Sequence, residues 1–98
     1  MASPADRQID EAFGLVLTRL RHERGLSQEA LGHGTNSGRT YVSQLERGKR
    51  GASLKTLFRF ANHLGVAPSE IVRLVEDKMV GPSSPFPPKD FLAPESPT

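Results

Sequence analysis

Apolar residues return every three or four positions along most of this sequence, in short segments separated by glycine or proline. This spacing lines one face of an α-helix, and no segment has the strict alternation of a half-buried strand. The pattern predicts an all-α fold of five short helices. The expected core residues are Ile9, Phe13, Val16, Leu17, Leu20, Ala30, Leu31, Val42, Leu45, Leu54, Leu57, Phe58, Phe60, Ala61, Leu64, Ile71, Leu74 and Val75.

Residues that start or stop helices give the expected boundaries. Ser27 and Ser53 are candidate N-caps of the second and fourth helices, because a serine hydroxyl can accept a hydrogen bond from a free amide of the first turn. Pro68 opens the fifth helix, at the position where proline is best tolerated. The third helix is expected from about Arg39 to Arg47. The expected stops are Gly25, the Gly32 to Gly38 region, Gly48 and Gly65.

The length of 98 residues fits one domain, which we place at residues 5–78. Six of the eight prolines fall in residues 79–98, where their fixed φ and missing amide donors prevent a continuous helix. We expect this stretch to be a Pro-rich C-terminal tail whose Phe86, Phe91 and Leu92 can dock on a neighbouring surface. A chain this small must bury nearly all of its large apolar side chains, so dimerisation would add stability.

Composition and spacing exclude several classes of protein. The absence of cysteine rules out disulfides, thiolate nucleophiles and cysteine-based zinc sites. His22, His33 and His63 lie on different predicted elements without a nearby carboxylate cluster, so we expect no metal and no other cofactor. No Ser, His and Asp set has the spacing of a catalytic nucleophile, and the GxxG at Gly48 to Gly51 is too short and too charged for a nucleotide-binding loop. We therefore expect a protein that is not an enzyme.

No segment predicts a membrane span. The longest uninterrupted apolar run, from Ala12 to Leu17, is far shorter than the ~20 residues that cross a bilayer. Together with the lack of cysteine, this favours a cytoplasmic protein with no membrane partner.

Positive charge is concentrated in one stretch of the chain. Between Arg39 and Arg59 six basic residues accompany a single acid, Glu46, for a net charge of +5, whereas the remainder of the chain carries −3. Such a block is expected for a phosphate-backbone partner, although a solvated helix face explains the charge alone equally well. The six basic residues are Arg39, Arg47, Lys49, Arg50, Lys55 and Arg59.

Residues 26–54 have the pattern of a helix-turn-helix, in which two short helices are joined by a turn rich in glycine and asparagine. If the second of these helices buries Val42 and Leu45, its opposite face is wholly polar. A helix about 10 to 12 Å in diameter fits the major groove, where arginine can bond guanine and glutamine can bond adenine. The polar face carries Arg39, Thr40, Ser43, Gln44 and Arg47.

Three ungapped stretches carry a resemblance to a known family. LSQEAL, RTYVSQLERGKR and SLKTLFRFANHLGVAPSEI resemble the lambda-repressor-like helix-turn-helix regulators, often called Cro/C1 or XRE type. The resemblance covers roughly residues 10 to 76 and includes polar positions that core packing would not dictate. It implies a compact five-helix lambda-repressor-like DNA-binding domain.

The resemblance also implies roles for individual residues, with base contacts that discriminate and phosphate contacts that position the protein. The residues that would face base edges are Arg39, Thr40 and Gln44, with Ser43 as a fourth candidate. Those that would hold phosphates are Gln28, which would also brace the recognition helix, together with Tyr41, Arg47, Lys49 and Arg50.

The one acid in the basic stretch, Glu46, should repel DNA. The resemblance implies that Glu46 turns inward and forms an ion pair with Arg21 of the first helix. The alternative is an exposed Glu46 beside Arg47. A buried pair would fix the third helix against the first.

The turn of the motif departs from the family pattern at three positions. Asn36 stands where glycine is usual, Ser37 where an apolar residue is usual, and Gly38 where a capping serine or aspartate is usual. Asparagine tolerates positive φ. The sequence does not fix the start of the third helix, the recognition helix of the motif, to better than one residue.

Together these features predict a sequence-specific transcriptional regulator, in the first instance a repressor, that binds double-stranded DNA as a homodimer. Its operator would be an inverted repeat with half-sites about 34 Å apart. We expect the dimer surface on the fifth helix and the tail beyond Val75, because this region has more apolar surface than one short helix can hide. The alternative is a protein-binding module, such as an antitoxin or adaptor, that engages a protein partner through the tail. The apolar row consists of Ile71, Val72, Leu74, Val75 and Val80.

Overall fold

The computed structural model describes residues 3–79, and these residues form five helices and no strand. The predicted all-α, five-helix fold is therefore confirmed. Beyond Met79, the predicted Pro-rich tail lies outside the described residues. Within the described range, no helix is both long enough and apolar enough to cross a membrane. The helices are α1 (Pro4–Glu23), α2 (Gln28–Gly34), α3 (Arg39–Glu46), α4 (Leu54–Leu64) and α5 (Pro68–Lys78).

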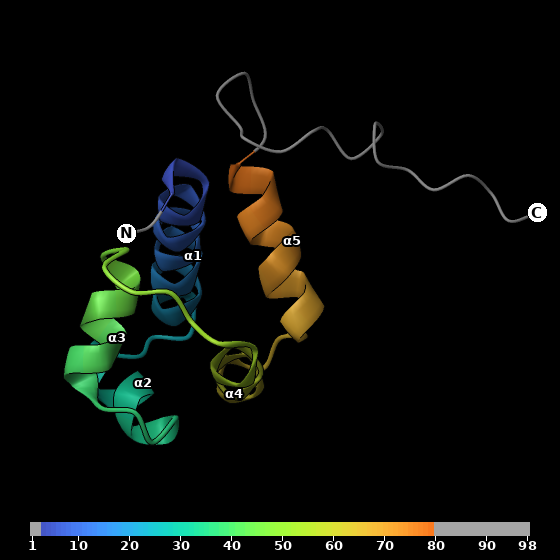
Figure 1. Cartoon of the computed structure of the whole chain (residues 1–98). Helices are drawn as coiled ribbons and strands as arrows, with labels where there is room; N and C mark the ends of the chain where they lie inside the picture. The colour runs from blue at the N-terminus through green and yellow to red at the C-terminus, as the bar shows by residue number, and fades with distance from the viewer. Residues whose placement is uncertain (1–2, 80–98) are drawn as a thin grey trace, which may run out of the picture.

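The helices pack around α1, the longest of the five (Figure 1). Helix α5 stands beside α1, while α2 and α3 pack against one another and α3 also packs against α1. Helix α4 lies at the foot of α5, and the segment from 47 to 53 crosses from α3 to reach it. This arrangement leaves α3 at the edge of the bundle, with one face inward and one outward.

All five helices contribute to one apolar core. Burying each large side chain contributes roughly 1.5 to 3 kcal/mol relative to exposure, so this cluster accounts for most of the folding drive of so small a domain. Its members are Phe13, Val16, Leu17, Leu20, Leu31, Val42, Leu45, Phe60, Ala61, Leu64 and Ile71, all of which the helical spacing predicted.

Helix α4 is rotated relative to the prediction. Leu54, Phe58 and Phe60 were all expected in the core, but the exposed fractions of Leu54 and Phe58 are 69% and 53%, and only Phe60 of the three is fully buried. The buried stripe therefore begins at Leu57 and continues through Phe60, Ala61 and Leu64, which also have helical spacing. Two overlapping stripes satisfy the same periodicity, and the packing of Phe60 beneath α3 decides between them. Ala30, also expected inside, is exposed.

The predicted caps form as expected. Ser27 and Ser53 accept hydrogen bonds from backbone amides of the first turns of α2 and α4, at 2.9 and 3.1 Å. Pro68 occupies the first turn of α5, and Gly65 ends α4 in the left-handed conformation with φ of 74°. Local sequence therefore fixes most of the helix ends.

The turn between α2 and α3 is tight despite its unusual residues. Asn36 adopts a φ of 57° and Gly38 a φ of 88°. The amides of Ser37 and Gly38 donate to the carbonyl of Gly32 at 2.8 and 3.1 Å, and a Cβ on Gly32 would lie 2.5 Å from the backbone of Gly38. The recognition helix starts at Arg39, which settles the position that the sequence left open.

Helices α1 and α3 meet at Gly14 with no side chain between them. A Cβ on Gly14 would lie 2.6 Å from the backbone oxygens of Leu45 and Glu46, in the last turn of α3. Those oxygens belong to the main chain and cannot rotate away. The missing side chain therefore sets how closely α3 approaches α1.

Gly14→Ala should destabilise the fold, even though alanine is the better helix former by about 1 kcal/mol. Overpacking against backbone atoms typically costs ~1 to 3 kcal/mol, because α1 and α3 must separate. Urea denaturation followed by circular dichroism measures the change. Leu15→Ala, at an exposed neighbouring position, is the control and should have a smaller effect. A higher midpoint for Gly14→Ala than for the wild type would contradict the close contact.

Candidate nucleic-acid interface

The outward face of α3 carries the predicted base-reading residues. Val42 and Leu45 have no exposed surface and anchor the helix to the core. The spacing of the polar residues places them beside or opposite this buried stripe. Among them, Arg39 and Thr40 are exposed, and Ser43 and Gln44 are partly exposed.

Glu46 turns inward from the end of α3 and forms an ion pair with Arg21 of α1. Arg21 donates from Nε and Nη2 to the two carboxylate oxygens at 2.6 and 3.0 Å. Only 11% of the Arg21 side chain and 5% of the Glu46 side chain are exposed. Gln28 donates its Nε2 to Glu46 at 2.9 Å, and Arg21 Nη1 donates to the carbonyl of Leu26 at 2.8 Å. One carboxylate thus ties α1, α2 and α3 together.

The pKa of Glu46 reflects these contacts. Burial on its own would raise the pKa, but hydrogen bonds from Arg21 and Gln28 and the positive charge of Arg21 outweigh it, and the pKa lies below its usual value. The carboxylate therefore stays ionised at neutral pH. Its charge is compensated within the protein.

Gln28 retains a hydrogen-bond donor after bracing α3. It is the first residue of α2 and is half-buried. A glutamine amide has two N–H groups, of which one is used on Glu46. The second is available to a phosphate at the helix N-terminus, where the helix dipole favours an anion.

Basic residues follow α3 directly. Arg47 and Lys49 are exposed, and Arg47 Nε makes a long, 3.4 Å hydrogen bond to the carbonyl of Ser43. Arg50 lies over the ring of Tyr41, with Cζ 5.0 Å from the ring centroid, and donates to Gln44 Oε1 at 3.3 Å. The Tyr41 ring in turn meets the buried Phe60 edge-on at 6.5 Å. Arg50 is therefore held in place by neutral partners, and no carboxylate within residues 3–79 pairs with its charge.

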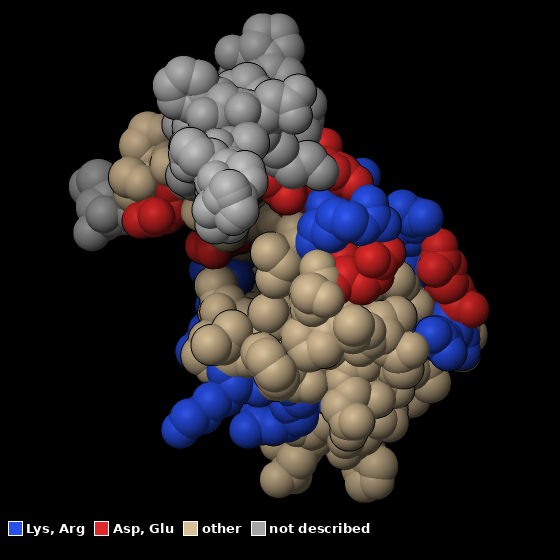
Figure 2. All heavy atoms as spheres, turned by 90° about the vertical axis from the view of Figure 1, so that its right-hand side faces the viewer, with Lys and Arg blue, Asp and Glu red and all other residues tan. Residues whose placement is uncertain are grey.

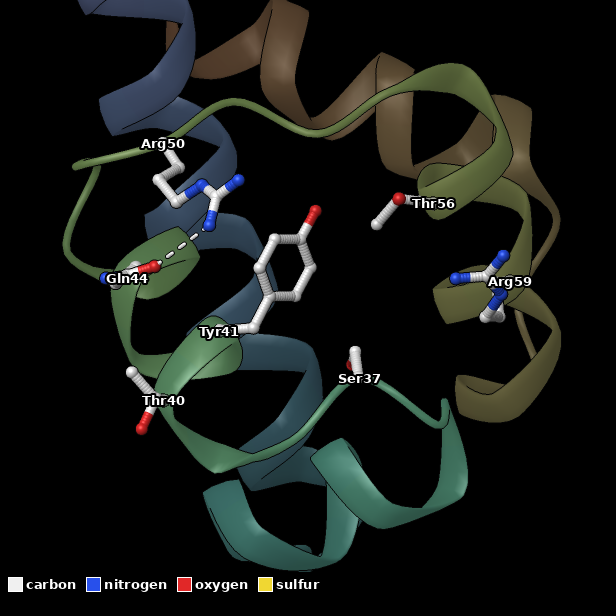
Figure 3. Close-up of a pocket in the computed structure, with 7 residues that line it drawn as sticks. All are labelled: Ser37, Thr40, Tyr41, Gln44, Arg50, Thr56 and Arg59. Carbon is white, nitrogen blue, oxygen red and sulfur yellow. Dashed lines mark hydrogen bonds between the residues drawn. The ribbon is translucent and has the colours of Figure 1, made fainter.

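Next to this face lies an open hollow of about 550 Å³ between α3 and α4 (Figure 3). No acidic side chain from residues 3–79 lines it. Two of the predicted base-reading residues and two of the predicted phosphate-binding residues border it, so this hollow joins the two groups. Its lining residues are Ser37, Thr40, Tyr41, Gln44, Arg50, Thr56 and Arg59.

Three lining residues, Ser37, Thr56 and Arg59, were assigned no site role from the sequence. Arg59 belongs to the basic stretch, but its position on α4, away from the helix-turn-helix, gave no reason to single it out. Only the packing of α4 beneath Tyr41 brings Arg59 to the hollow. Neither Gln28 nor the exposed Arg47 and Lys49 line it.

The histidines do not gather into a site. His63 of α4 packs over Gly34 of α2, where a Cβ would lie 2.1 Å from the imidazole ring, so it serves as an interhelix contact. Within residues 3–79 no three His, Asp or Glu side chains lie close enough to hold a metal ion.

Comparison with known proteins identifies the family of this chain. The family model described as Helix-turn-helix matches residues 17–71, which is more than half of the chain. The chain therefore belongs to this family, the Cro/C1-type helix-turn-helix transcriptional regulators, and carries a DNA-binding domain. This is a family of DNA-binding regulators rather than of enzymes.

Several individual proteins are similar to this chain in sequence or in structure. An uncharacterised HTH-type transcriptional regulator, y4dJ, from Sinorhizobium fredii is 37% identical over 68 residues, covering 69% of this chain and 88% of the relative. The control protein C.MunI from a Mycoplasma species is 40% identical over 65 residues, or 65% of this chain and 88% of the relative. The crystal structure of the restriction-modification controller protein C.AhdI from Aeromonas hydrophila superposes with a TM-score of 0.61 at 39% identity, covering 63% of this chain and 94% of that one.

Removing the carboxylate of Glu46 should strongly destabilise the fold. Glu46→Ala leaves Arg21 charged and buried, and breaking a buried pair in this way typically costs ~3 to 5 kcal/mol. The control is Glu23→Ala, which breaks the exposed Arg19–Glu23 pair and should cost about 0 to 1 kcal/mol. Urea midpoints at pH 7 give both values, and equal midpoints for wild type and Glu46→Ala would rule out a stabilising pair.

The same pair should also contribute to acid sensitivity. Because the folded pKa of Glu46 lies below the ordinary value of 4.5, its stabilisation is fully present above that pH and is lost as the pH falls through the folded pKa. The stability difference between wild type and Glu46→Gln should therefore shrink as the pH is lowered from 5 to about 2.

Proposed function

We propose that the protein is a sequence-specific repressor that binds double-stranded DNA as a homodimer on an inverted-repeat operator. The observation that carries this proposal is the polar outer face of α3, which is backed by the fully buried Val42 and Leu45 and on which Arg39 and Thr40 are exposed. In this proposal a bound dimer would act by occupying its operator. With bacterial relatives, such a regulator would work in the cytoplasm.

In this proposal α3 enters the major groove and its polar residues divide into two groups. Arg39 would bond a guanine edge through its guanidinium fork, and Gln44 an adenine edge through its amide, with Thr40 and Ser43 beside them. The phosphate-binding group comes from α2, from α3 and from the segment after α3, and it would fix the register of α3 on the duplex. That group is Gln28, Tyr41, Arg47, Lys49 and Arg50.

The proposed dimer surface lies on α4 and α5. Ile71, expected on it, is fully buried in the core of its own subunit, and Val80 lies outside the described residues. The large apolar residues that remain exposed here are Leu54, Phe58 and Val72, and Leu54 and Val72 border the same apolar groove. Figure 2 faces this side and shows a broad area free of charged side chains. Exposed large apolar residues on a side with few charges support association with a second copy.

Selection of bound fragments from random duplex DNA tests the function directly. We expect an inverted repeat with half-sites about one helical turn apart. Affinity for that site should fall by orders of magnitude between ~50 and 200 mM salt, because several phosphate contacts release counterions. An affinity for DNA that does not respond to salt, or no selected sequence, would favour the protein-binding alternative, in which residues 79–98 engage a partner.

Two single substitutions test the division of roles. Gln44→Ala should relax the preference at one base pair by ~1 to 3 kcal/mol, whereas Lys49→Ala should weaken all sequences about equally and lower the salt slope by about 1. Binding assays on the selected site and on single-base variants separate the two outcomes. Identical effects of the two substitutions would overturn the assignment.

Phe58→Glu should convert the dimer to a monomer, because it places a charge in the proposed apolar interface while leaving the core intact. Sedimentation velocity at micromolar concentrations gives the association state. Leu15→Glu is the matched control, since Leu15 is similarly apolar and 57% exposed but lies on α1. A wild type that stays monomeric at high micromolar concentration would remove the homodimer from the proposal.

A further inference from the structure

The hollow between α3 and α4 gathers positive charge from two separate elements. Arg50 reaches it from the segment after α3, and Arg59 reaches it from α4. Figure 3 shows the two guanidinium groups on opposite sides of the hollow, with the Tyr41 hydroxyl pointing into the space between them. Among the described residues no carboxylate lines the hollow, so the two charges reinforce one another there.

The arginines of the described residues fall into two groups, those that pair with a carboxylate and those that do not. Arg19, Arg21 and Arg73 each pair with a carboxylate. Across residues 3–79, neither Arg50 nor Arg59 has such a partner. Arg50 is instead fixed by the Tyr41 face and by Gln44. Two cations that are not neutralised internally, one of them already oriented, form a site for an external anion.

We propose that this hollow seats one phosphate of the DNA backbone, held by Arg59 together with Arg50 and the Tyr41 hydroxyl. The inference rests on the proposed function and adds Arg59 of α4 to the DNA contacts. A backbone phosphate is favoured over a free anion because Thr40 and Gln44, on the proposed base-reading face, form part of the same rim. The open hollow also leaves room for the sugars on either side of the phosphate.

A phosphate in this position would bridge two helices. Tyr41 of α3 rests edge-on against Phe60 of α4, and Arg59 is the neighbour of Phe60 in sequence. The contact would therefore fix α4 as well as α3 on the duplex. Because the distance between the two helices is set by the core, the seat would determine how deeply α3 lies in the groove.

Arg59→Gln in the full chain tests the proposal. We expect affinity for the selected operator to fall about tenfold at ~100 mM salt, the slope of log K against log salt to drop by about 0.9, and the base preferences to stay unchanged. Lys55→Gln is the matched control, because it removes the same charge from an exposed position on α4 that does not line the hollow. If the two variants lose the same affinity, the effect comes from overall positive charge, and the proposed phosphate site is wrong.

Operators with single neutral methylphosphonate linkages locate the phosphate. One position should weaken binding of the wild type by more than it weakens binding of Arg59→Gln, which retains only the contacts of Arg50 and Tyr41. If every methylphosphonate acts equally on both proteins, the phosphate seat is wrong. If the wild type selects no DNA at all, both the proposed function and the phosphate site are wrong. If Arg59→Gln binds the operator as tightly as the wild type does, only the phosphate site is wrong.

A titration with inorganic phosphate tests whether the hollow binds a free phosphate ion instead of a phosphate of the DNA backbone. At matched ionic strength without DNA, phosphate should raise the melting temperature of the wild type and of Arg59→Gln equally. A rise that is specific to the wild type, combined with an unchanged salt slope for Arg59→Gln on DNA, would assign the hollow to a free anion and overturn the backbone contact.

Discussion

The position of α3 depends on one buried carboxylate. Glu46 accepts hydrogen bonds from Arg21 of α1 and Gln28 of α2, so three helices meet at a single group. A buried ion pair contributes little net stability over an apolar replacement, but it has strict geometric requirements. Its effect here is to fix the orientation of a helix whose apolar anchor consists of only Val42 and Leu45. Neutralising the acid internally also leaves the surrounding basic stretch free of a competing negative charge.

The fold was largely predictable because local signals agreed with one another. Serine caps, a proline at the start of α5 and the glycine stops all act within a few residues, and the helical spacing of apolar residues marked most of the core. The rotation of α4 was not predictable, since two stripes that share Leu57, Ala61 and Leu64 both fit the period. Packing of Phe60 beneath Tyr41 chooses between them, and that contact joins residues distant in sequence.

The candidate site also has features that the sequence predicted and features that only the packing of separate helices reveals. The outward residues of α3 followed from two buried positions on one short helix, and the inward turn of Glu46 came from the family resemblance. Arg59 and the approach at Gly14 depend on how separate helices meet, which the spacing within one helix does not specify. Helix α4 consequently carries three surfaces at once: the core stripe, the cationic wall of the hollow, and the exposed apolar side with Leu54 and Phe58.

Tyr41 is the only tyrosine in a chain that has no tryptophan. Its ring touches the buried Phe60 on one side and the guanidinium of Arg50 on the other, at the wall of the hollow. The intrinsic ultraviolet fluorescence of this protein therefore originates almost entirely from one side chain at the candidate interface. The molecule carries its own optical reporter there, and an occupant can be followed without attaching a dye.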